Sequence, residues 1–283
     1  MKKLFFPILM LALASLACGL NVSLPEPVEK TGETVVENFF IPRMNGEADV
    51  AVNIGGGELS ITSGAQTGLL EGEITYNVAD FKPVVTQEGT DIRIDQGTLE
   101  IDGIPTFENV TNEWDLSFSA DPVTLRIGAG AYRGTYDFGG MALSNLYIED
   151  GASDVKLTFS QRNLTEMTFF DYQTGASSVE LNNLANANFS TMTFRSGVGN
   201  YTLDFSGVLN RDASVKIESG LSNVKVIIPE GTKARVVVDS GLTNVTANGD
   251  WTESGNTYSQ EGGDAELYVV IELGAGNLEL TNR

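Results

Sequence analysis

A pattern of apolar and polar positions recurs eight times along this chain. Each copy reads apolar, x, apolar, x, x, Gly, x, small, x, apolar, x, apolar, and the only miss is Gly134 at the last position of one copy. Apolar positions alternate with other positions on both sides of the glycine, which is typical of β-strands that bury one face. The pattern therefore predicts pairs of short strands that meet at a tight bend. The glycines at the bends are Gly55, Gly128, Gly151, Gly175, Gly197, Gly220, Gly241 and Gly274.

The spacing of these glycines predicts a β-solenoid. From Gly128 to Gly241 they recur every 21 to 24 residues, and a two-strand repeat of about this length is one rung of such a stack. A single rung cannot bury its apolar row, so rungs must stack, roughly 4.8 Å apart. We expect one buried inner column and one exposed outer row. The column is Val155, Val179, Tyr201, Val224 and Val245, and the row is Lys156, Glu180, Thr202, Lys225 and Thr246.

The bends impose requirements on particular residues. We expect glycine at each corner because a positive φ, or a close approach of the adjacent rung, excludes a Cβ atom. Four rungs carry asparagine three residues after the corner, at Asn200, Asn223, Asn244 and Asn277. Asparagine tolerates turn conformations and can hydrogen-bond its counterpart in the next rung. This row predicts a turn-stabilising ladder, and a row of ligand-binding amides is the alternative.

Two stretches interrupt the repeat. Residues 45–120 contain several strand-like segments without the period, and we interpret them as an N-terminal antiparallel β module. Residues 121–283 form the predicted solenoid domain, with an insert near residues 250–262 that reads as a hairpin turning at Ser254-Gly255-Asn256. Trp251 and Tyr258 are placed to pair across this hairpin, which would cover the end of the stack.

The start of the chain predicts export and lipidation. Residues 1–17 have two lysines followed by an apolar run that is too short to span a membrane, as in a secretory signal peptide. Cys18 follows Ser15-Leu16-Ala17, which resembles the lipobox of bacterial lipoproteins. Residues 18–44 are acidic and contain prolines, so we expect a tether. The predicted location is the extracytoplasmic face of a cell membrane, held by a lipid on Cys18.

Composition excludes several classes of function. The 283 residues carry a net charge of −21 and include no histidine and one cysteine. A Ser-His-Asp triad, an imidazole metal site and an internal disulfide are therefore impossible. The acidic charge disfavours nucleic acid, which binds proteins through Lys and Arg. The motifs for bound calcium, for a P-loop and for a dinucleotide are missing, so we expect no metal and no cofactor.

Paired carboxylates are the remaining candidates for catalysis, since they can perform acid-base chemistry on sugars. Glu149/Asp150 and Glu113/Asp115, together with Glu37, are the possible members. They are neighbours on predicted strands or turns, and we interpret them as solvated charges. Lys and Arg are scattered over outward positions and form no constellation with them. We therefore predict no catalytic residues.

The order of these segments resembles a known family. IGGGELSI, EITYN, a Lys-Pro strand, NEWDLSFS and LRIGAGAYRGTYDFGG, followed by rungs with GAS and SGL, are similar to bacterial toast-rack proteins. The C-terminal domains of the cell-wall-active antibiotic response (LiaF-type) family and related adhesin domains share this style. The resemblance covers residues 45–283. It implies a β-rich, envelope-associated, non-enzymatic module.

Three hypotheses of function follow. The first is a lipid-anchored envelope lipoprotein that acts as a non-catalytic interaction or envelope-stress module, with a membrane and an unidentified envelope component as partners. The second is an adhesin-like or structural surface spacer. The third is a polysaccharide-active β-helix enzyme, which would need a groove with converging carboxylates and Arg or Lys.

Overall fold

The computed structural model describes residues 27–29, 31–98, 104–106 and 109–282. The predicted signal peptide, Cys18 and most of the predicted tether lie outside the described residues. Within them, one mixed sheet of 15 strands dominates, with two short 3-10 helices, η1 (Ala79–Phe81) and η2 (Leu184–Ala187). No described helix is long and apolar enough to cross a membrane.

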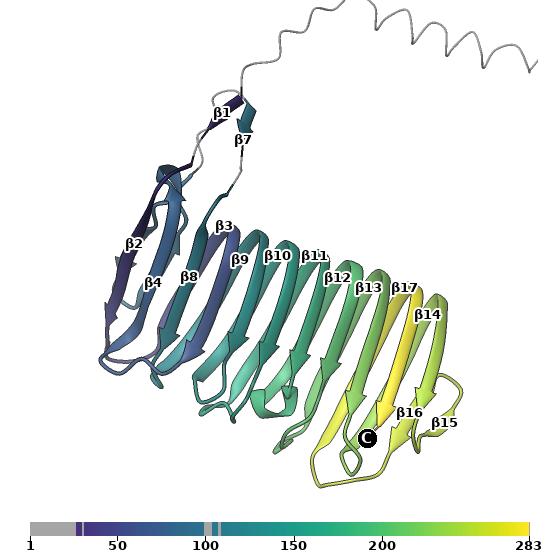
Figure 1. Ribbon diagram of the computed structural model, residues 1–283. Coiled ribbons are helices and arrows are strands. Elements are labelled where there is room, and N and C mark those ends of the chain that lie inside the picture. Colours follow the sequence, from purple (N-terminus) through teal and green to yellow (C-terminus); the bar gives the residue numbers. More distant parts are fainter. Residues whose placement is uncertain (1–26, 30, 99–103, 107–108, 283) are drawn as a thin grey trace, which may run out of the picture.

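Eight long strands build the stack, each with 16 or 17 residues. Each bends at its middle, so that its two halves lie face to face and the bends line the upper rim in Figure 1. The core fills the space between the two layers of half-strands. The long strands are β3 (Ala48–Ser63), β9 (Pro122–Asp137), β10 (Ala142–Thr158), β11 (Met167–Asn182), β12 (Phe189–Asp204), β13 (Ala213–Ile228), β14 (Lys233–Asn248) and β17 (Glu266–Asn282).

Parallel pairing aligns equivalent residues of successive rungs. Val155, Val179, Tyr201 and Val224 pair in register and are each at most 2% exposed. Of the next residues along, Lys156 and Glu180 are exposed, whereas Thr202 and Lys225 are only partly exposed. A slip of one residue would exchange the two faces, so this burial confirms the predicted alternation and the all-β, solenoid-like fold.

The predicted frame is wrong by two residues at one corner. Gly130, not Gly128, is in register with Gly55 and Gly151, and Gly134 pairs with Leu59 and Val155. An even shift preserves the inward and outward faces, which is why both alignments fit the apolar pattern. In the corrected frame Gly134 is still the exception, because it stands at the inner position that Leu59 and Val155 occupy in the adjacent rungs.

The stacking order also departs from the order of the sequence. The last strand, β17, is inserted between β13 and β14, so that Val224 pairs with Leu278 and Leu278 pairs with Val245. Val245 therefore lies in the terminal rung and is only partly buried, not a fully buried member of the column as predicted. The chain therefore steps over one place between β13 and β14, and after β15 and β16 it returns to fill that place with β17.

Residues 45–120 continue the same sheet. β6 (Asp91–Asp95) pairs in parallel with the first half of β3, and β8 (Asn112–Phe118) pairs in parallel with its second half. Antiparallel strands β4 (Gly68–Val78) and β2 (Thr31–Pro42) follow β8, while β5 (Val84–Glu88) pairs with β6. The prediction of an antiparallel module over residues 45–120 is therefore wrong in part, because β3, β6 and β8 run parallel and β3 is itself a rung of the stack. β1 (Pro27–Glu29) and β7 (Ile104–Thr106) form a separate two-stranded sheet.

The insert after β14 is a hairpin, β15 (Thr252–Ser254) and β16 (Thr257–Gln260), turning at Gly255 and Asn256 as predicted. Tyr258 pairs with Glu253 and not with Trp251. β16 in turn pairs antiparallel with residues 234–237 of β14. The hairpin therefore covers the first half of the terminal rung.

Candidate functional site

The corner glycines are required by close packing between rungs. None of Gly197, Gly220, Gly241 and Gly274 has a positive φ. A Cβ atom added at any of them would lie 2.6 to 2.8 Å from the carbonyl oxygen of the glycine in the adjacent rung, which is closer than van der Waals contact permits. Gly151 and Gly175 stack in the same column, which continues through Gly130 to Gly55. This column lets the chain bend sharply and presents the next residue outward.

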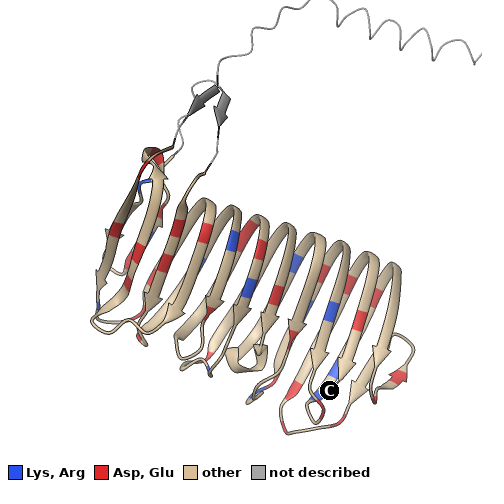
Figure 2. Cartoon of the chain, viewed as in Figure 1, with Lys and Arg blue, Asp and Glu red and all other residues tan. Residues whose placement is uncertain are grey.

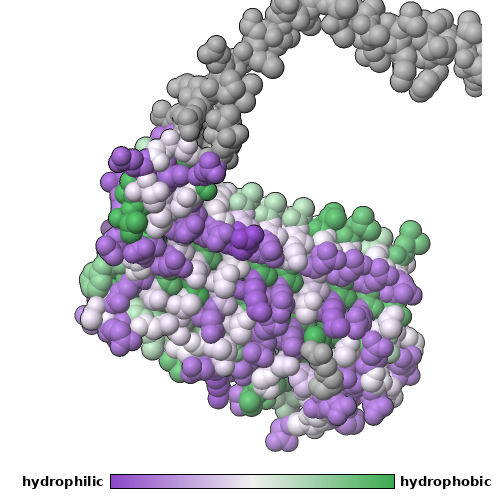
Figure 3. All heavy atoms as spheres, in the orientation of Figure 1, coloured by the Kyte–Doolittle hydropathy of each residue, from purple (hydrophilic) through white to green (hydrophobic). Residues whose placement is uncertain are grey.

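That next residue is apolar in every strand from β9 to β14, and together these residues form what we call the corner ridge. Val198, Leu221 and Leu242 are 54%, 58% and 87% exposed. Figure 3 shows hydrophobic side chains along the upper rim, above the bends of these strands. In register, the ridge is Ala131, Ala152, Ala176, Val198, Leu221, Ala275 and Leu242.

Sequence reasoning missed the ridge. The repeat pattern treated the position after the glycine as variable, because alanine, valine and leucine differ in size and no inward periodicity requires them. The residue after the corner glycine is nevertheless apolar or glycine in all eight rungs. A solvated bend has no folding reason to conserve apolar character, so the ridge is a candidate contact surface.

Polar rows lie on either side of the ridge. On one side, Glu218, Glu272 and Asp239 are adjacent across β13, β17 and β14 and help to line an open groove of about 600 Å³. Lys216 contacts both Glu218 at 2.7 Å and Glu272 at 3.2 Å. Its ammonium lowers the pKa of Glu218, and the two carboxylates raise the pKa of Lys216.

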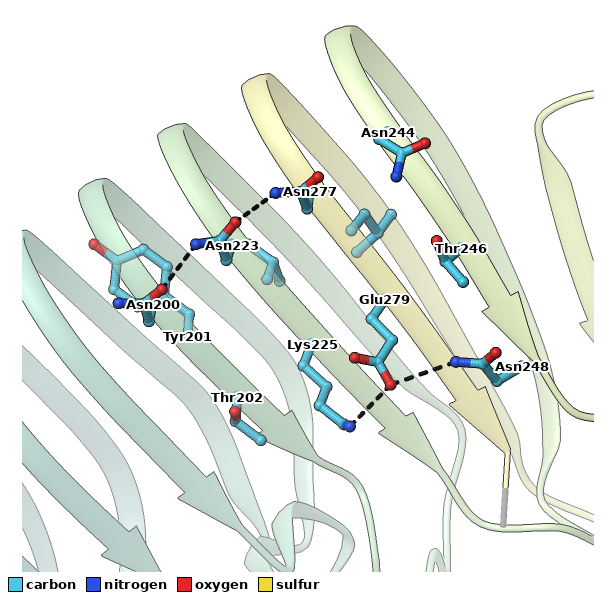
Figure 4. A pocket seen from close by; sticks show the side chains of 12 residues that line it. Asn200, Tyr201, Thr202, Asn223, Lys225, Asn244, Thr246, Asn248, Asn277 and Glu279 are labelled. Atoms are coloured by element: carbon cyan, nitrogen blue, oxygen red, sulfur yellow. Dashed lines mark hydrogen bonds and ion pairs between the residues drawn. The ribbon is translucent and has the colours of Figure 1, made fainter.

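The asparagine row lies on the other side, where it lines a shallow groove of about 550 Å³ on the outer face of β12, β13, β17 and β14. Asn223 Nδ2 donates to Asn200 Oδ1 at 2.9 Å, and Asn277 Nδ2 donates to Asn223 Oδ1 at 2.7 Å (Figure 4). Asn244 is in register with Asn277, but the hydrogen bonds join only the first three members. The ladder forms between side chains that also face solvent, so it is compatible with both interpretations of the row.

Below the ladder, the two charged residues that line the groove, Lys225 and Glu279, form an ion pair. Lys225 Nζ contacts Glu279 Oε1 at 2.9 Å, and Asn248 Nδ2 donates to the same oxygen at 3.4 Å (Figure 4). These contacts lower the pKa of Glu279, chiefly through the hydrogen bond from Lys225. A carboxylate held in its ionised form by a lysine is a poor proton donor, so the groove lacks the raised pKa that a general acid requires.

The two predicted carboxylate pairs lie on different strands, and Glu113 and Asp115 line a hollow of about 260 Å³ in which Arg133 contacts Glu58 at 2.7 Å. Glu149 is exposed on the outer face, whereas Asp150 is buried, which corrects its interpretation as a solvated charge. Glu113 and Asp115 are both exposed and lie on one strand. Glu37 accepts a hydrogen bond from Tyr76 at 2.9 Å and contacts Lys82 at 3.4 Å. Figure 2 shows charges of both signs spread over the strands.

Asp150 is the centre of a buried polar network. It accepts hydrogen bonds from Thr174 Oγ1, from Ser153 Oγ at 2.9 Å and from Tyr172 Oη at 2.9 Å. Tyr132 Oη lies 3.4 Å away and itself accepts a hydrogen bond from Tyr136. Burial, reinforced by nearby negative charge, raises the pKa of these tyrosines well above the usual value. A buried polar group requires hydrogen-bond partners. Hydroxyl groups supply them for the Asp150 carboxylate inside the stack.

Within the described residues, no cluster of three Asp, Glu, Cys or His side chains is arranged to hold a metal ion. Cys18, the predicted lipidation site, lies outside the described residues.

Fold and surface together define an open stack of bent parallel strands with an apolar rim. The sequence model for the N-terminal domain of toast_rack, DUF2154, matches residues 26–169, just over half of the 283 residues. This chain belongs to the toast-rack family, as its sequence resemblance indicated.

The chain is similar to solved structures of bacterial proteins. A candidate cell adhesion protein from Clostridium sporogenes ATCC 15579 is 19% identical, with a TM-score of 0.52 over 89% of this chain and 100% of that one. A candidate adhesin from Parabacteroides merdae ATCC 43184 is 8% identical, with a TM-score of 0.38 over 90% of this chain and 99% of that one. At 19% identity, the likeness to the Clostridium sporogenes protein supports the architecture alone. No curated protein sequence matches the chain.

Proposed function

We propose that this protein is a lipid-anchored, non-catalytic interaction module of the bacterial cell envelope, with an envelope-stress-related role, and that it contacts its partner through the corner ridge. The sequence before residue 27 supports the anchor, because an apolar export signal precedes Cys18 in a lipobox-like context. Acyl chains attached there would keep the stack at a membrane surface.

The observation that carries the proposal is the ridge. Three large apolar side chains, Val198, Leu221 and Leu242, are more than half exposed on a straight rim. Exposed apolar residues aligned in this way are typical of protein contact surfaces. The acidic row that contains Glu218, Glu272 and Asp239 favours a partner whose apolar residues are flanked by Lys or Arg.

Two experiments test the parts separately. Cys18→Ser should move the protein from the membrane fraction to the soluble fraction and remove the lipid mass from its N-terminus. A photoreactive residue in place of Leu221 should form one specific adduct in cells, whereas one in place of Leu164, an equally exposed leucine outside the ridge, should not. Membrane retention without added mass would exclude the anchor, and equal labelling from both positions would exclude the ridge.

A spacer is the second candidate function. It is favoured by the outer faces, where Lys216 and Lys225 of β13 form ion pairs with Glu272 and Glu279 of β17 and leave few free charges for recognition. Under this alternative, Leu221→Ser and Leu242→Ser would leave every envelope phenotype of the chain unchanged, while a deletion of whole rungs would not.

A further inference from the structure

The two ends of the stack are covered differently. At the N-terminal end, both halves of β3 have neighbours, because β6 pairs with the first half and β8 with the second. At the other end, β16 pairs only with residues 234–237 of β14. Among the described residues, no strand pairs with the outer edge of residues 241–248. The stack therefore lacks half a rung at this end.

The free half of β14 is incomplete in its packing. Val245 and Ala247 are partly buried, whereas their neighbours in β17, Leu278 and Leu280, are 1% and 0% exposed. An additional strand would complete the apolar column.

The same segment lacks the usual protection of a sheet edge. Residues 241–248 read GLTNVTAN and contain no charged residue and no proline. The outward row, in which Lys156, Glu180, Lys225 and Glu279 are charged and Ser60, Thr135 and Thr202 are neutral, ends here in the neutral Thr246. Natural edge strands are normally blocked by charge, proline or a bulge, so this edge is suited to accept another strand.

One segment of the chain matches the strand that is missing. Second halves of the rungs read Asn-Val-Lys-Val at residues 223–226, Asn-Leu-Glu-Leu at 277–280 and Asn-Val-Thr-Ala at 244–247. Residues 21–24, which lie outside the described part, read Asn-Val-Ser-Leu and are followed by Pro25. We propose that residues 21–24 of a second copy of this chain add to the free edge of β14 as a parallel strand.

Each residue of the donated segment then has a defined neighbour. Asn21 extends the asparagine ladder beyond Asn244, and Ser23 faces outward beside Thr246. The other two side chains point inward. Val22 covers Val245, and Leu24 covers Ala247.

A chain cannot donate this strand to itself. Ten strand spacings separate β2 from β14 in the sheet, which is about 48 Å. The seven residues from Leu24 to Thr31 reach at most about 24 Å when fully extended. The donor and the acceptor therefore lie at opposite ends of the stack, and the association joins copies head to tail. Acylation of Cys18 is not required, so the inference does not rest on the proposed function.

The first test adds a peptide in trans. A synthetic peptide with the sequence of residues 19–26 is mixed with the full chain, and backbone amide exchange is followed. We expect slower exchange at residues 242–248 and no change along β2, the other edge of the sheet. A peptide carrying Val22→Lys and Leu24→Lys should lose this effect, whereas one carrying Ser23→Lys should keep it. Unchanged exchange with the native peptide, or equal effects of all three, would overturn the proposal.

The second test uses the whole chain. Full chains with Val22→Lys and Leu24→Lys, or with Ser23→Lys alone, are prepared in the same detergent as the native chain. Their masses are then measured by sedimentation over a range of concentrations. The native and Ser23→Lys chains should associate with rising concentration, and the double variant should stay monomeric. These substitutions lie outside the folded stack, so a loss of association is not a loss of folding. A native chain that stays monomeric throughout would refute self-association, and binding of the peptide alone would then assign the edge to a strand from another protein.

Discussion

The side-chain amide of Asn277 donates a 2.7 Å hydrogen bond to Asn223, although 54 residues separate them. Asn244 is closer to Asn223 in the sequence, but it lies one rung further away because β17 is inserted between β13 and β14. The hydrogen bonds of the asparagine ladder therefore join rungs that are adjacent in space and not rungs that are consecutive in the chain.

Replacing Asn223, at the centre of the ladder, should lower the unfolding free energy more than replacing Asn244 at its end. Asn223→Ala loses the bond donated to Asn200 and the bond accepted from Asn277. Because both bonds are exposed, we expect a loss of about 1 kcal/mol in unfolding free energy. Asn244→Ala, the matched control, breaks no ladder bond and should change stability by less than about 0.5 kcal/mol. Urea unfolding measures the difference, and equal midpoints for the two variants would contradict a structural role.

The position of β17 shows what a repeat pattern can and cannot predict. The pattern predicted which residues of a rung face inward, because burial follows from alternation along one strand. It did not predict the order of the last two rungs, because β14 and β17 present nearly the same columns to β13. The longer connection between them, with Trp251 and Tyr258, permits the exchange but does not require it.

A side chain at a corner should disturb the stack far more than a change on its outer face. Gly220→Val places a Cβ atom about 2.7 Å from the carbonyl oxygen of Gly197, and the backbone must move to accept it. We expect a cost of about 1–3 kcal/mol, as for other overpacked positions. Lys225→Val, on the outer row of the same strand, loses only a partly exposed ion pair with Glu279 and should cost about 0–1 kcal/mol. Thermal unfolding compares them, and similar melting temperatures would argue against close packing of the corners.

The apolar repeat pattern could predict neither the exposure of the corner ridge nor the burial of Asp150, for different reasons. Leu242 is apolar without being buried, and an apolar residue in a strand is normally assigned to the core. Asp150 is charged but buried, and its partners Tyr172 and Thr174 come from the neighbouring strand. In both cases the three-dimensional neighbours decide the role of the residue.

The Asp150 network supplies a third prediction. Asp150→Ala would remove the acceptor of several buried hydroxyls, including those of Ser153 and Tyr172. Each unsatisfied buried group costs about 1–3 kcal/mol, so the variant should be destabilised by at least about 2 kcal/mol. Glu149→Ala, one residue earlier and exposed, should be nearly neutral. Denaturant unfolding of both variants tests the expectation, which would fail if they were equally stable.

A fourth prediction concerns acid, and it rests on the turn before β4. Glu71 Oε1 accepts hydrogen bonds from the backbone nitrogens of Gly68 at 2.6 Å and Thr67 at 2.7 Å, and from the Thr67 hydroxyl at 2.7 Å. These bonds, chiefly the one from Gly68, lower the pKa of Glu71 from 4.5 to about 2. A depressed pKa in the folded state means that the contribution to stability is complete above the unfolded pKa. It is then lost as the pH falls from about 4.5 to about 2.

The direction of this change of stability with pH can be measured with one variant and one control. Glu71→Gln should lower the melting temperature at pH 7, and its difference from the native chain should disappear as the pH approaches 2, where the native carboxyl is protonated. Glu73→Gln, on the same strand but exposed, is the matched control and should change the melting temperature at pH 7 by less. Carbon-detected titration should place the midpoint of Glu71 near pH 2. A midpoint near 4.5 would mean that the turn does not hold the carboxylate, and the predicted loss of stability in acid would then have to come from other groups.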